Sequence, residues 1–338
     1  MSSGLNREIH LAARPQGWPT LDTFVLVETP IPAPTEGQVL VRNIFMSVDP
    51  YMRGRMNAVR SYAPPYEVGQ VLYGGAAGRV VASRFAAFRE GDVVLSNNGW
   101  REYFVSDGSG LERIAPVAPL SYYLGVLGMP GMTAYVGLLE IGQPKVGETV
   151  FVSAASGAVG SVVGQLARIT GCRAIGSAGS NEKVRVLLHE LGFDAAFNYK
   201  ETPPEQALRQ AAPDGIDIYL DNVGGEHLQA ALSAMKPFGR IPLCGMISTY
   251  NASTPPPGPN NLMLMVAKRL TMRGFLVGDH ADRKAAFRAE VGGYVRDGRI
   301  RVRETVADGI ARAPEAFLAL LRGDHIGKMV VRVGPDPD

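Results

Sequence analysis

The stretch at 148–171 constrains the fold more than any other part of this sequence. Its first half, ETVFVSAA (148–155), is an apolar run typical of a buried strand, and GAVGSVVGQLARITG (157–171) follows at once with a helical pattern. Three small residues occupy the turn at the spacing of the dinucleotide-binding fingerprint, with alanine in place of the first glycine: Ala155, Gly157 and Gly160. Small residues let backbone N–H groups at a helix N-terminus approach a pyrophosphate. We therefore predict a nucleotide-binding turn in preference to a tight turn without a ligand.

Strand and helix patterns alternate through the whole middle of the chain. Helical patterns cover MTAYVGLLEIG (132–142) and NEKVRVLLHELG (181–192), and the second carries a face of Val184, Leu187, Leu188 and Leu191. The further strand patterns are CRAIGSAG (172–179), IDIYLDNVGG (216–225), RIPLCGMI (240–247) and LTMRGFLV (270–277). Alternation of this kind predicts a doubly wound parallel sheet with helices on both faces.

Both ends of the chain have β character instead. The N-terminal strand patterns, separated by Pro and Gly clusters, are FVLVE (24–28), QVLVRNIF (38–45), GRVVAS (78–83), GDVVLS (91–96) and REYFVS (101–106). Near the C-terminus, IRVRETV (300–306) and KMVVRV (328–333) flank a helical pattern at 313–324. We predict a β-barrel or sandwich domain from 1–124 and 299–338, with an inserted α/β domain at 125–298.

The overall charge argues against two classes of partner. Lys and Arg number 34 and Asp and Glu 32, so the net charge is +2 and offers no strong field for nucleic acid or anionic lipid. The opening residues lack the apolar core of a secretion signal, and the longest apolar runs are too short to span a bilayer. Two cysteines fit a reducing compartment. We expect a cytoplasmic protein that contacts neither nucleic acid nor membrane.

The residues after the fingerprint favour NADP(H) over NAD(H). NAD enzymes usually carry an acidic residue about 20 positions beyond the turn, where it binds the ribose 2′-hydroxyl. Here that region reads IGSAGSNEK and has no carboxylate at the strand end. It offers Ser177, Ser180 and Lys183, which suit a 2′-phosphate that a carboxylate would repel.

A catalytic metal is not expected. The first domain contains no cysteine, and Cys172 and Cys244 both lie in strand patterns of the second. The five histidines are dispersed without paired ligand spacing: His10, His189, His227, His280 and His325. A hydride acceptor that needs no metal is a polarised carbon–carbon double bond. A neutral hydroxyl such as that of tyrosine stabilises the enolate that forms.

These features accompany a set of segments that resembles a known family. The segments are MSVDPYMRGRM (46–56), GMPGMTAYVGL (128–138), SAASGAVGSVVGQLA (153–167), GSNEK (179–183), GFDAAFNYK (192–200), DNVGG (221–225), CGMISTYN (244–251) and GDHIGK (323–328). In this order they resemble the zinc-independent medium-chain dehydrogenase/reductases, in the branch of prostaglandin reductases, leukotriene B4 dehydrogenases, plant alkenal double-bond reductases and bacterial curcumin reductases.

The resemblance implies a GroES-like barrel, a Rossmann domain, a cleft between them, and NADPH-dependent reduction of the double bond of α,β-unsaturated aldehydes and ketones. The residues implied along NADPH are Gly157, Ala158, Val159 and Gly160 at the pyrophosphate, Lys183 and Tyr199 at the 2′-phosphate, Asn222 beside the cofactor, Cys244, Gly245, Met246, Ile247, Ser248, Thr249 and Tyr250 under the nicotinamide side, and Phe275, Leu276 and Val277 at the nicotinamide end. Tyr250 matches the proposed hydrogen-bond donor or proton source, and Tyr51 matches a residue of the substrate pocket.

One position departs from the family pattern. The family usually has asparagine before the final Gly-Lys segment, where it contacts the cofactor, and this chain has His325. Histidine still donates one hydrogen bond, and its protonation would make the contact depend on pH.

Several interpretations stay open at the level of sequence. Tyr250 assists catalysis, or a ribose hydroxyl or water does so in its place. We interpret Tyr51 as a pocket wall rather than an acid, and Arg53 and Arg55 as surface salt-bridge residues rather than groups that steer acidic substrates. Met129, Met132, Met246 and the LMLM run (262–265) are interpreted as core or cleft packing. The loop NASTPPPGPNN (251–261) is a lid or a plain surface loop.

The function also keeps alternatives. The chain is a reductase of α,β-unsaturated carbonyls, a quinone reductase or allylic-alcohol dehydrogenase, or a non-catalytic NADPH-binding protein. The low charge disfavours the last. Relatives often dimerise through an edge strand of the Rossmann sheet, so we expect a homodimer, with LTMRGFLV (270–277) as the edge.

Overall fold

The computed structural model describes residues 4–336, which divide into two compact units. Unit 1 comprises the described parts of 1–124, 304–325 and 329–338, and unit 2 comprises 125–303 and 326–328. The chain returns to unit 1 at Glu304, whereas the sequence analysis placed the return at 299. Gln165 accounts for the difference, since its side chain donates to the Arg301 carbonyl and accepts from the Arg301 N–H at 3.1 and 2.7 Å.

Unit 2 is built on a six-stranded sheet with the order β10-β9-β8-β11-β12-β13. Every neighbouring pair runs parallel. Its strands are β8 (Thr149–Val152), β9 (Arg173–Ala178), β10 (Ala195–Asn198), β11 (Ile216–Leu220), β12 (Met235–Leu243) and β13 (Thr271–Gly274). The predicted doubly wound sheet is confirmed. The strand order reverses between β8 and β11, which is where such sheets bind ligands at their carboxyl ends.

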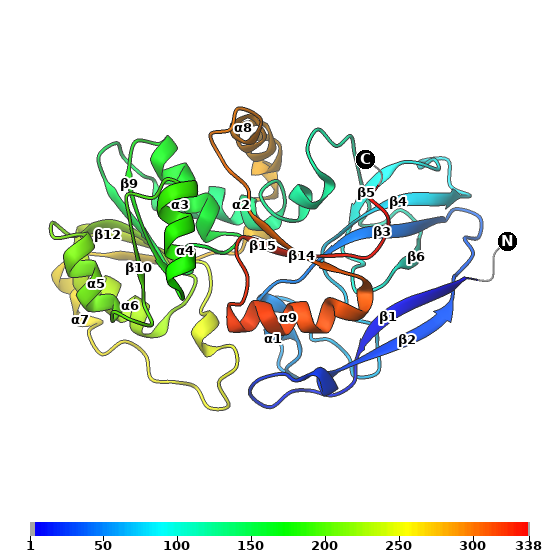
Figure 1. The fold of residues 1–338 in the computed structure, drawn as a ribbon, viewed down its shortest axis with the longest axis horizontal. Helices are drawn as coiled ribbons and strands as arrows, with labels where there is room; N and C mark the ends of the chain where they lie inside the picture. The colour runs from blue at the N-terminus through cyan, green and yellow to red at the C-terminus, as the bar shows by residue number, and fades with distance from the viewer. Residues whose placement is uncertain (1–3, 337–338) are drawn as a thin grey trace. The chain divides into compact units, whose positions relative to one another are not determined.

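Helices connect these strands, and Figure 1 shows α3 beside β9 and α5 beside α6, as their contacts require. The helical segments of unit 2 are α2 (Met129–Tyr135), η3 (Val136–Gly142), α3 (Gly160–Ile169), α4 (Asn181–Arg185), η4 (Val186–Glu190), α5 (Pro204–Ala211), α6 (Gly225–Ala234), η5 (Ile247–Thr249), α7 (Met263–Ala267), η6 (Val277–Arg283) and α8 (Lys284–Arg296). The two helices predicted at 132–142 and 181–192 begin as the α-helices α2 and α4. Each then continues as a π-helix, η3 and η4 respectively. The wider turn of η4 buries Val186 with Leu187, and Val184 stays half-exposed.

The core of unit 2 centres on stacked aromatic rings. Phe151 of β8 lies between Tyr219 of β11 and Phe197 of β10, at ring-centroid distances of 4.9 and 5.9 Å. The LMLM run contributes less than expected: Leu264 and Met265 pack against this core, but Met263 is 76% exposed. Val266 is also exposed, so one face of α7 stays open among the described residues.

Unit 1 holds a seven-stranded sheet and a separate hairpin. The sheet has the order β14-β15-β3-β4-β5-β7, with β6 also paired to β3, and β1 and β2 form an antiparallel pair that is visible in Figure 1. The strands are β1 (Leu5–Leu11), β2 (Phe24–Pro30), β3 (Val39–Ser47), β4 (Ala76–Ser83), β5 (Val93–Ser96), β6 (Tyr103–Ser106), β7 (Glu112–Ile114), β14 (Glu304–Asp308) and β15 (Lys328–Arg332). The helical segments are η1 (Leu21–Thr23), α1 (Tyr51–Arg55), η2 (Leu120–Leu124), η7 (Ile310–Arg312) and α9 (Ala313–Arg322).

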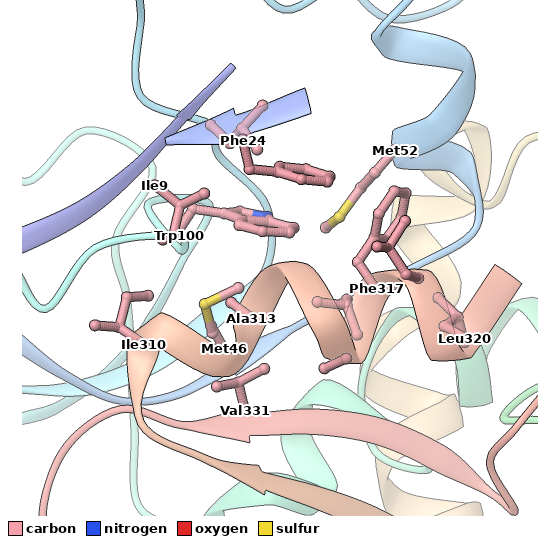
Figure 2. Packing of buried hydrophobic residues seen from close by; sticks show 14 of the residues in the cluster. Ile9, Phe24, Met46, Met52, Trp100, Ile310, Ala313, Phe317, Leu320 and Val331 are labelled. Atoms are coloured by element: carbon pink, nitrogen blue, oxygen red, sulfur yellow. The ribbon is translucent and has the colours of Figure 1, made fainter. Parts of the chain in front are cut away.

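The core of unit 1 forms where α9 covers the hairpin and the sheet. Figure 2 shows Phe24 stacked on Trp100, with Phe317 of α9 meeting Trp100 edge-on and Met52 beside them. Met52 comes from α1, a helix that the sequence analysis did not predict, and it is fully buried. This contact fixes α1 in place. None of the helices formed by residues 4–336 has the length and apolar character to cross a membrane.

Candidate cofactor and active site

The turn after β8 has the geometry that its small residues predict. Ala154 adopts a left-handed backbone conformation (φ 50°), and the Gly157 N–H closes the turn on its carbonyl at 3.0 Å. Helix α3 starts at Gly160, where a Cβ would lie 2.5 Å from the Ala154 oxygen. Glycine is therefore required at this position. Ala158 and Val159 complete the turn and stand before the helix N-terminus, where a pyrophosphate is favoured.

The adjacent strand ends bring basic and hydroxyl groups together. Strands β9 and β10 are parallel neighbours with Ala178 opposite Asn198, so the residues that follow them meet at one edge. A Cβ on Gly179 would lie 3.3 Å from the Tyr199 hydroxyl oxygen and 3.4 Å from Cε of Lys200. Lys183 stands in the first turn of α4, and its backbone N–H donates to the hydroxyl oxygen of Ser180, the N-cap residue, at 3.3 Å.

This edge differs from the sequence expectation in two ways. Ser177 is fully buried inside β9, so its hydroxyl is not available at the strand end. Lys200 was not singled out, although it directly follows the predicted Tyr199. The signal that identifies it is the parallel pairing of β9 with β10, since the carboxyl ends of parallel strands lie at the same edge. Two lysines and a phenol at this edge fit a 2′-phosphate. A carboxylate beside them, that of Glu201, accepts from Asn181 Nδ2 at 2.7 Å.

A buried histidine packs against the ring of Tyr199. His227 of α6 meets the Tyr199 ring edge-on at 5.0 Å between centroids, and its Nε2 has no hydrogen-bond partner among the described residues. Burial lowers the pKa of His227 to about 4. The imidazole is therefore neutral at physiological pH and acts as a packing surface.

A hydrogen-bond network fixes the end of β11. The Asp221 carboxylate accepts from the Tyr219 hydroxyl at 2.6 Å and from the Gly224 N–H at 2.8 Å. Asn222 donates from Nδ2 to the Ser153 carbonyl at 2.8 Å, which ties β11 to the end of β8. Burial raises the pKa of Asp221, while these hydrogen bonds oppose the rise. The predicted Asn222 thus stands at the switch point of the sheet, beside the fingerprint turn.

The segment from Cys244 to Tyr250 follows the next strand. The backbone N–H groups of Cys244 and Gly245 both donate to the Asp221 carbonyl, at 2.9 and 3.1 Å. Met246 leads into η5, formed by Ile247, Ser248 and Thr249, after which the chain reaches Tyr250. The Tyr250 hydroxyl oxygen lies 3.0 Å from where a Cβ on Gly245 would be, so the ring folds back over this glycine.

The remaining predicted residues, 275–277 and His325, lie near other elements than the segment 244–250 does. The Phe275 ring packs on Gly137 of η3, where a Cβ would approach it to 2.8 Å, and Leu276 and Val277 continue beyond β13. Gly327 reaches the fingerprint turn, since its N–H donates to the Ser156 carbonyl at 2.7 Å. His325 precedes it by two residues and is grouped with unit 1.

The interpretation of two arginines of unit 1 as surface residues is wrong. Arg53 and Arg55 are both buried in α1. Arg53 donates to the Gly17 carbonyl at 2.7 Å and to Asn57 Oδ1 at 2.8 Å. Arg55 lies against the rings of Tyr66 and Tyr73. The backbone carbonyls and aromatic faces around them replace the water that a surface arginine keeps.

The cysteine and acidic side chains of residues 4–336 do not gather into a metal site. Within residues 4–336, no group of three or more His, Cys, Asp or Glu side chains is arranged to hold a metal ion. Cys172 donates to the Lys145 carbonyl at 3.2 Å. Burial and the nearby Asp221 raise the pKa of Cys244 to about 12.

Comparison with known proteins places this arrangement in a family. Residues 7–114 match the N-terminal domain of an oxidoreductase family, and residues 158–290 match a zinc-binding dehydrogenase domain. The chain is 45% identical to an NADPH-dependent curcumin reductase of Escherichia coli, over 98% of each chain. It is 47% identical to an NADP-dependent 2-alkenal reductase of Nicotiana tabacum, over 87% of each.

A solved structure agrees over nearly the whole length. The NADPH complex of CurA from Vibrio vulnificus superposes with a TM-score of 0.93 at 43% identity, over 97% of this chain and 99% of the other. Such identity across both units exceeds what a shared fold alone produces. The chain belongs to the zinc-independent medium-chain dehydrogenase/reductases, in the branch that holds the curcumin and alkenal reductases.

Proposed function

We propose that this protein reduces the carbon–carbon double bond of α,β-unsaturated aldehydes and ketones with NADPH. The observation that carries the proposal is the edge of unit 2 where Lys183, Tyr199 and Lys200 follow neighbouring strands beside a fingerprint turn. The identity to curcumin and 2-alkenal reductases supports the substrate class.

Different residues of unit 2 are proposed to bind different parts of the cofactor. The turn at Gly157, Ala158, Val159 and Gly160 holds the pyrophosphate, and Lys183, Lys200 and Tyr199 hold the 2′-phosphate. The nicotinamide half lies against Asn222, the segment 244–250 and the segment 275–277. His325 takes the place of the family asparagine. When bound, NADPH supplies the hydride that reaches the β-carbon of the substrate.

Tyr250 is the proposed hydrogen-bond donor of unit 2. Negative charge develops on the carbonyl oxygen as hydride reaches the β-carbon, and a neutral phenol stabilises it by donating one hydrogen bond. Gly245 leaves room for this ring, because a Cβ there would lie 3.0 Å from the Tyr250 hydroxyl oxygen and the ring would have to shift slightly. We also propose Tyr51 of unit 1 as a residue that contacts the substrate.

The test measures NADPH oxidation with 2-alkenals and with a branched enone. We expect saturable turnover with NADPH, far less with NADH, and no loss with a zinc chelator. A preference for NADH would contradict the 2′-phosphate assignment. Turnover of quinones but not of enones would replace the substrate class, and tight NADPH binding without turnover of any acceptor would indicate a non-catalytic role.

The proposal includes a homodimer formed at the edge of the unit 2 sheet. Strand β13 ends the sheet, and exposed apolar side chains at the start of α7 and within it precede β13 in the chain. These side chains are Leu262, Met263 and Val266. A contiguous edge strand with apolar neighbours favours pairing with a second copy. Light scattering should give twice the chain mass, and Met263→Asp should yield the monomer. A wild-type monomer would refute this part.

A cytoplasmic location completes the proposal. Cys172 and Cys244 are both unpaired, as a reducing compartment requires. Fractionation of the source cells is the direct test. Recovery of the activity in a secreted or membrane fraction would contradict it.

A further inference from the structure

A carboxylate stands at the edge of unit 2 where the 2′-phosphate is proposed to bind. Glu201 directly follows Lys200 and comes two positions after Tyr199. Its backbone N–H donates to the Asn198 carbonyl at 3.1 Å, which turns the chain just beyond β10. A carboxylate at this edge opposes the binding of a phosphate, because like charges repel. Selection of NADPH here therefore depends on where the Glu201 side chain is held.

Asn181 holds this carboxylate from the neighbouring segment of the chain. Its Nδ2 donates to Glu201 Oε1 at 2.7 Å. Asn181 is the first residue of α4 and lies two positions before Lys183, and α4 contacts both β9 and β10. The hydrogen bond therefore joins the segment that follows β9 to the segment that follows β10. A neutral amide, which adds no charge to this edge, takes up part of the hydrogen-bonding capacity of the carboxylate.

The hydrogen bonds of this network allow one orientation for each side-chain amide. A carboxylate only accepts, so Asn181 must turn its NH₂ group toward Glu201. Asn181 Oδ1 then accepts from Asn198 Nδ2 at 3.2 Å, and Asn198 Oδ1 accepts from the Lys200 N–H at 3.1 Å. A backbone donor at one end and a carboxylate at the other thus fix both amides. Because each link matches a donor with an acceptor, the network favours one position of Glu201.

We propose that Asn181 is a positioning residue for coenzyme selectivity, which keeps the Glu201 carboxylate from the two lysines proposed to bind the 2′-phosphate. Without its amide partner, this carboxylate would pair with a lysine instead, because charge-assisted hydrogen bonds are the strong ones. It would then compete with the phosphate for the same cation. NADH carries a neutral hydroxyl in place of the phosphate, so the position of Glu201 affects it little. The inference rests on the proposed placement of the 2′-phosphate.

A double-mutant cycle on coenzyme affinity tests this role. Fluorescence titration gives the Kd values of NADPH and NADH for the wild type, Asn181→Ala, Glu201→Gln and the double variant. We expect Asn181→Ala to weaken NADPH binding about fivefold and to leave NADH binding within about twofold. In the Glu201→Gln background, Asn181→Ala should change NADPH binding less than about twofold, because no charge remains to be held. The same loss in both backgrounds, or equal losses for NADPH and NADH, would overturn the proposal.

Two further measurements separate charge from structure. The loss in Asn181→Ala, relative to the wild type, should shrink as the salt concentration rises from about 0.05 to about 0.5 M, because ions screen exposed charges. A loss that salt does not change would contradict the proposal.

Glu182→Gln is the matched control, since it removes another carboxylate at this edge, in the first turn of α4. Asn181→Ala should cause the same loss of NADPH affinity in this background as in the wild type. Disappearance of the loss there would assign it to the total charge of the edge and overturn the role of Glu201.

Failure of the underlying assignment has a different signature. If Lys183→Gln weakens NADPH and NADH equally, the 2′-phosphate does not bind at this edge. That result would reject the proposed site, and the role of Asn181 with it, before the Asn181 variants are made.

Discussion

The two units build their sites in opposite ways. In unit 2 the proposed cofactor residues stand at the ends of neighbouring parallel strands and on one turn, so the backbone places them. In unit 1 the cluster of Arg55, Tyr66 and Tyr73 depends on side chains that pack against one another. A site that the backbone topology places can be predicted from a local sequence motif. A site that depends on side-chain packing cannot, because its residues come close together only after folding.

The strongest way to break the backbone-built site is Gly160→Val. A Cβ there would lie 2.5 Å from the Ala154 oxygen and 2.7 Å from the Ala155 Cα, both of which are backbone atoms that cannot move aside. We expect NADPH affinity to fall more than about 100-fold, because the turn must open. Fluorescence titration measures it. Gly292→Ala is the control: it lies in α8 with only ordinary contact at 3.8 Å, and should bind NADPH normally and raise the melting temperature. Normal NADPH binding by Gly160→Val would show that the turn is not the cofactor site.

A smaller effect is expected from Tyr250→Phe, which removes one donor and leaves the backbone of unit 2 intact. The rate constant kcat should fall about 100-fold at unchanged NADPH affinity, as for loss of one oxyanion donor. Steady-state kinetics with an enone check it. If kcat stays within about twofold, a ribose hydroxyl or water performs the task, and Tyr250 only covers the cofactor.

The lysines at the strand ends of unit 2 are proposed to bind the 2′-phosphate through their side chains, in a site that the backbone otherwise places. Their removal tests how much the side chains add. Lys183→Gln should weaken NADPH binding about 10- to 100-fold, the value of a hydrogen bond to a charged group, and leave NADH binding unchanged. Lys200→Gln should act in the same direction, because its side chain reaches the same glycine as Tyr199. Equal losses for NADPH and NADH would show that these lysines do not contact the 2′-phosphate.

The smallest effect concerns stability rather than activity. The pKa of His227 lies near 4 in the folded chain because of burial, below the ordinary 6.5 that applies when it is unfolded. Between these two pKa values, His227 therefore binds a proton in the unfolded chain but not in the folded chain. This contribution is complete above pH 6.5 and is lost as the pH falls toward 4, by about 3 kcal/mol in the free energy of unfolding. Denaturant unfolding at several pH values should show a shallower decline for His227→Phe than for the wild type. Parallel declines would contradict the assignment.

Much of the fold follows from local pattern, and the misses have physical causes. Five of the six parallel strands were predicted near their observed positions, because buried strands read as apolar runs. Strand β10 was missed, since its four residues are only half-buried and form no such run. Helix α1 was missed, since five residues are too few to show helical periodicity. The π-helices η3 and η4 escaped for a related reason: their turns are wider than the 3.6-residue repeat. Arg53 and Arg55 were interpreted as surface residues because composition cannot show an aromatic or carbonyl lining.

By itself, the sequence determined the α/β insertion, the fingerprint turn and the preference for a 2′-phosphate over a ribose hydroxyl. Each depends on residues that lie within about 30 positions, where strand, turn and helix geometry leaves few choices. Only the tertiary structure decided that Lys200 lies beside Tyr199 over Gly179, that His227 packs against Tyr199, and that Arg55 lies against the rings of Tyr66 and Tyr73. These contacts are side-chain neighbours across strands and loops, and no periodic pattern in the chain encodes which of them meet.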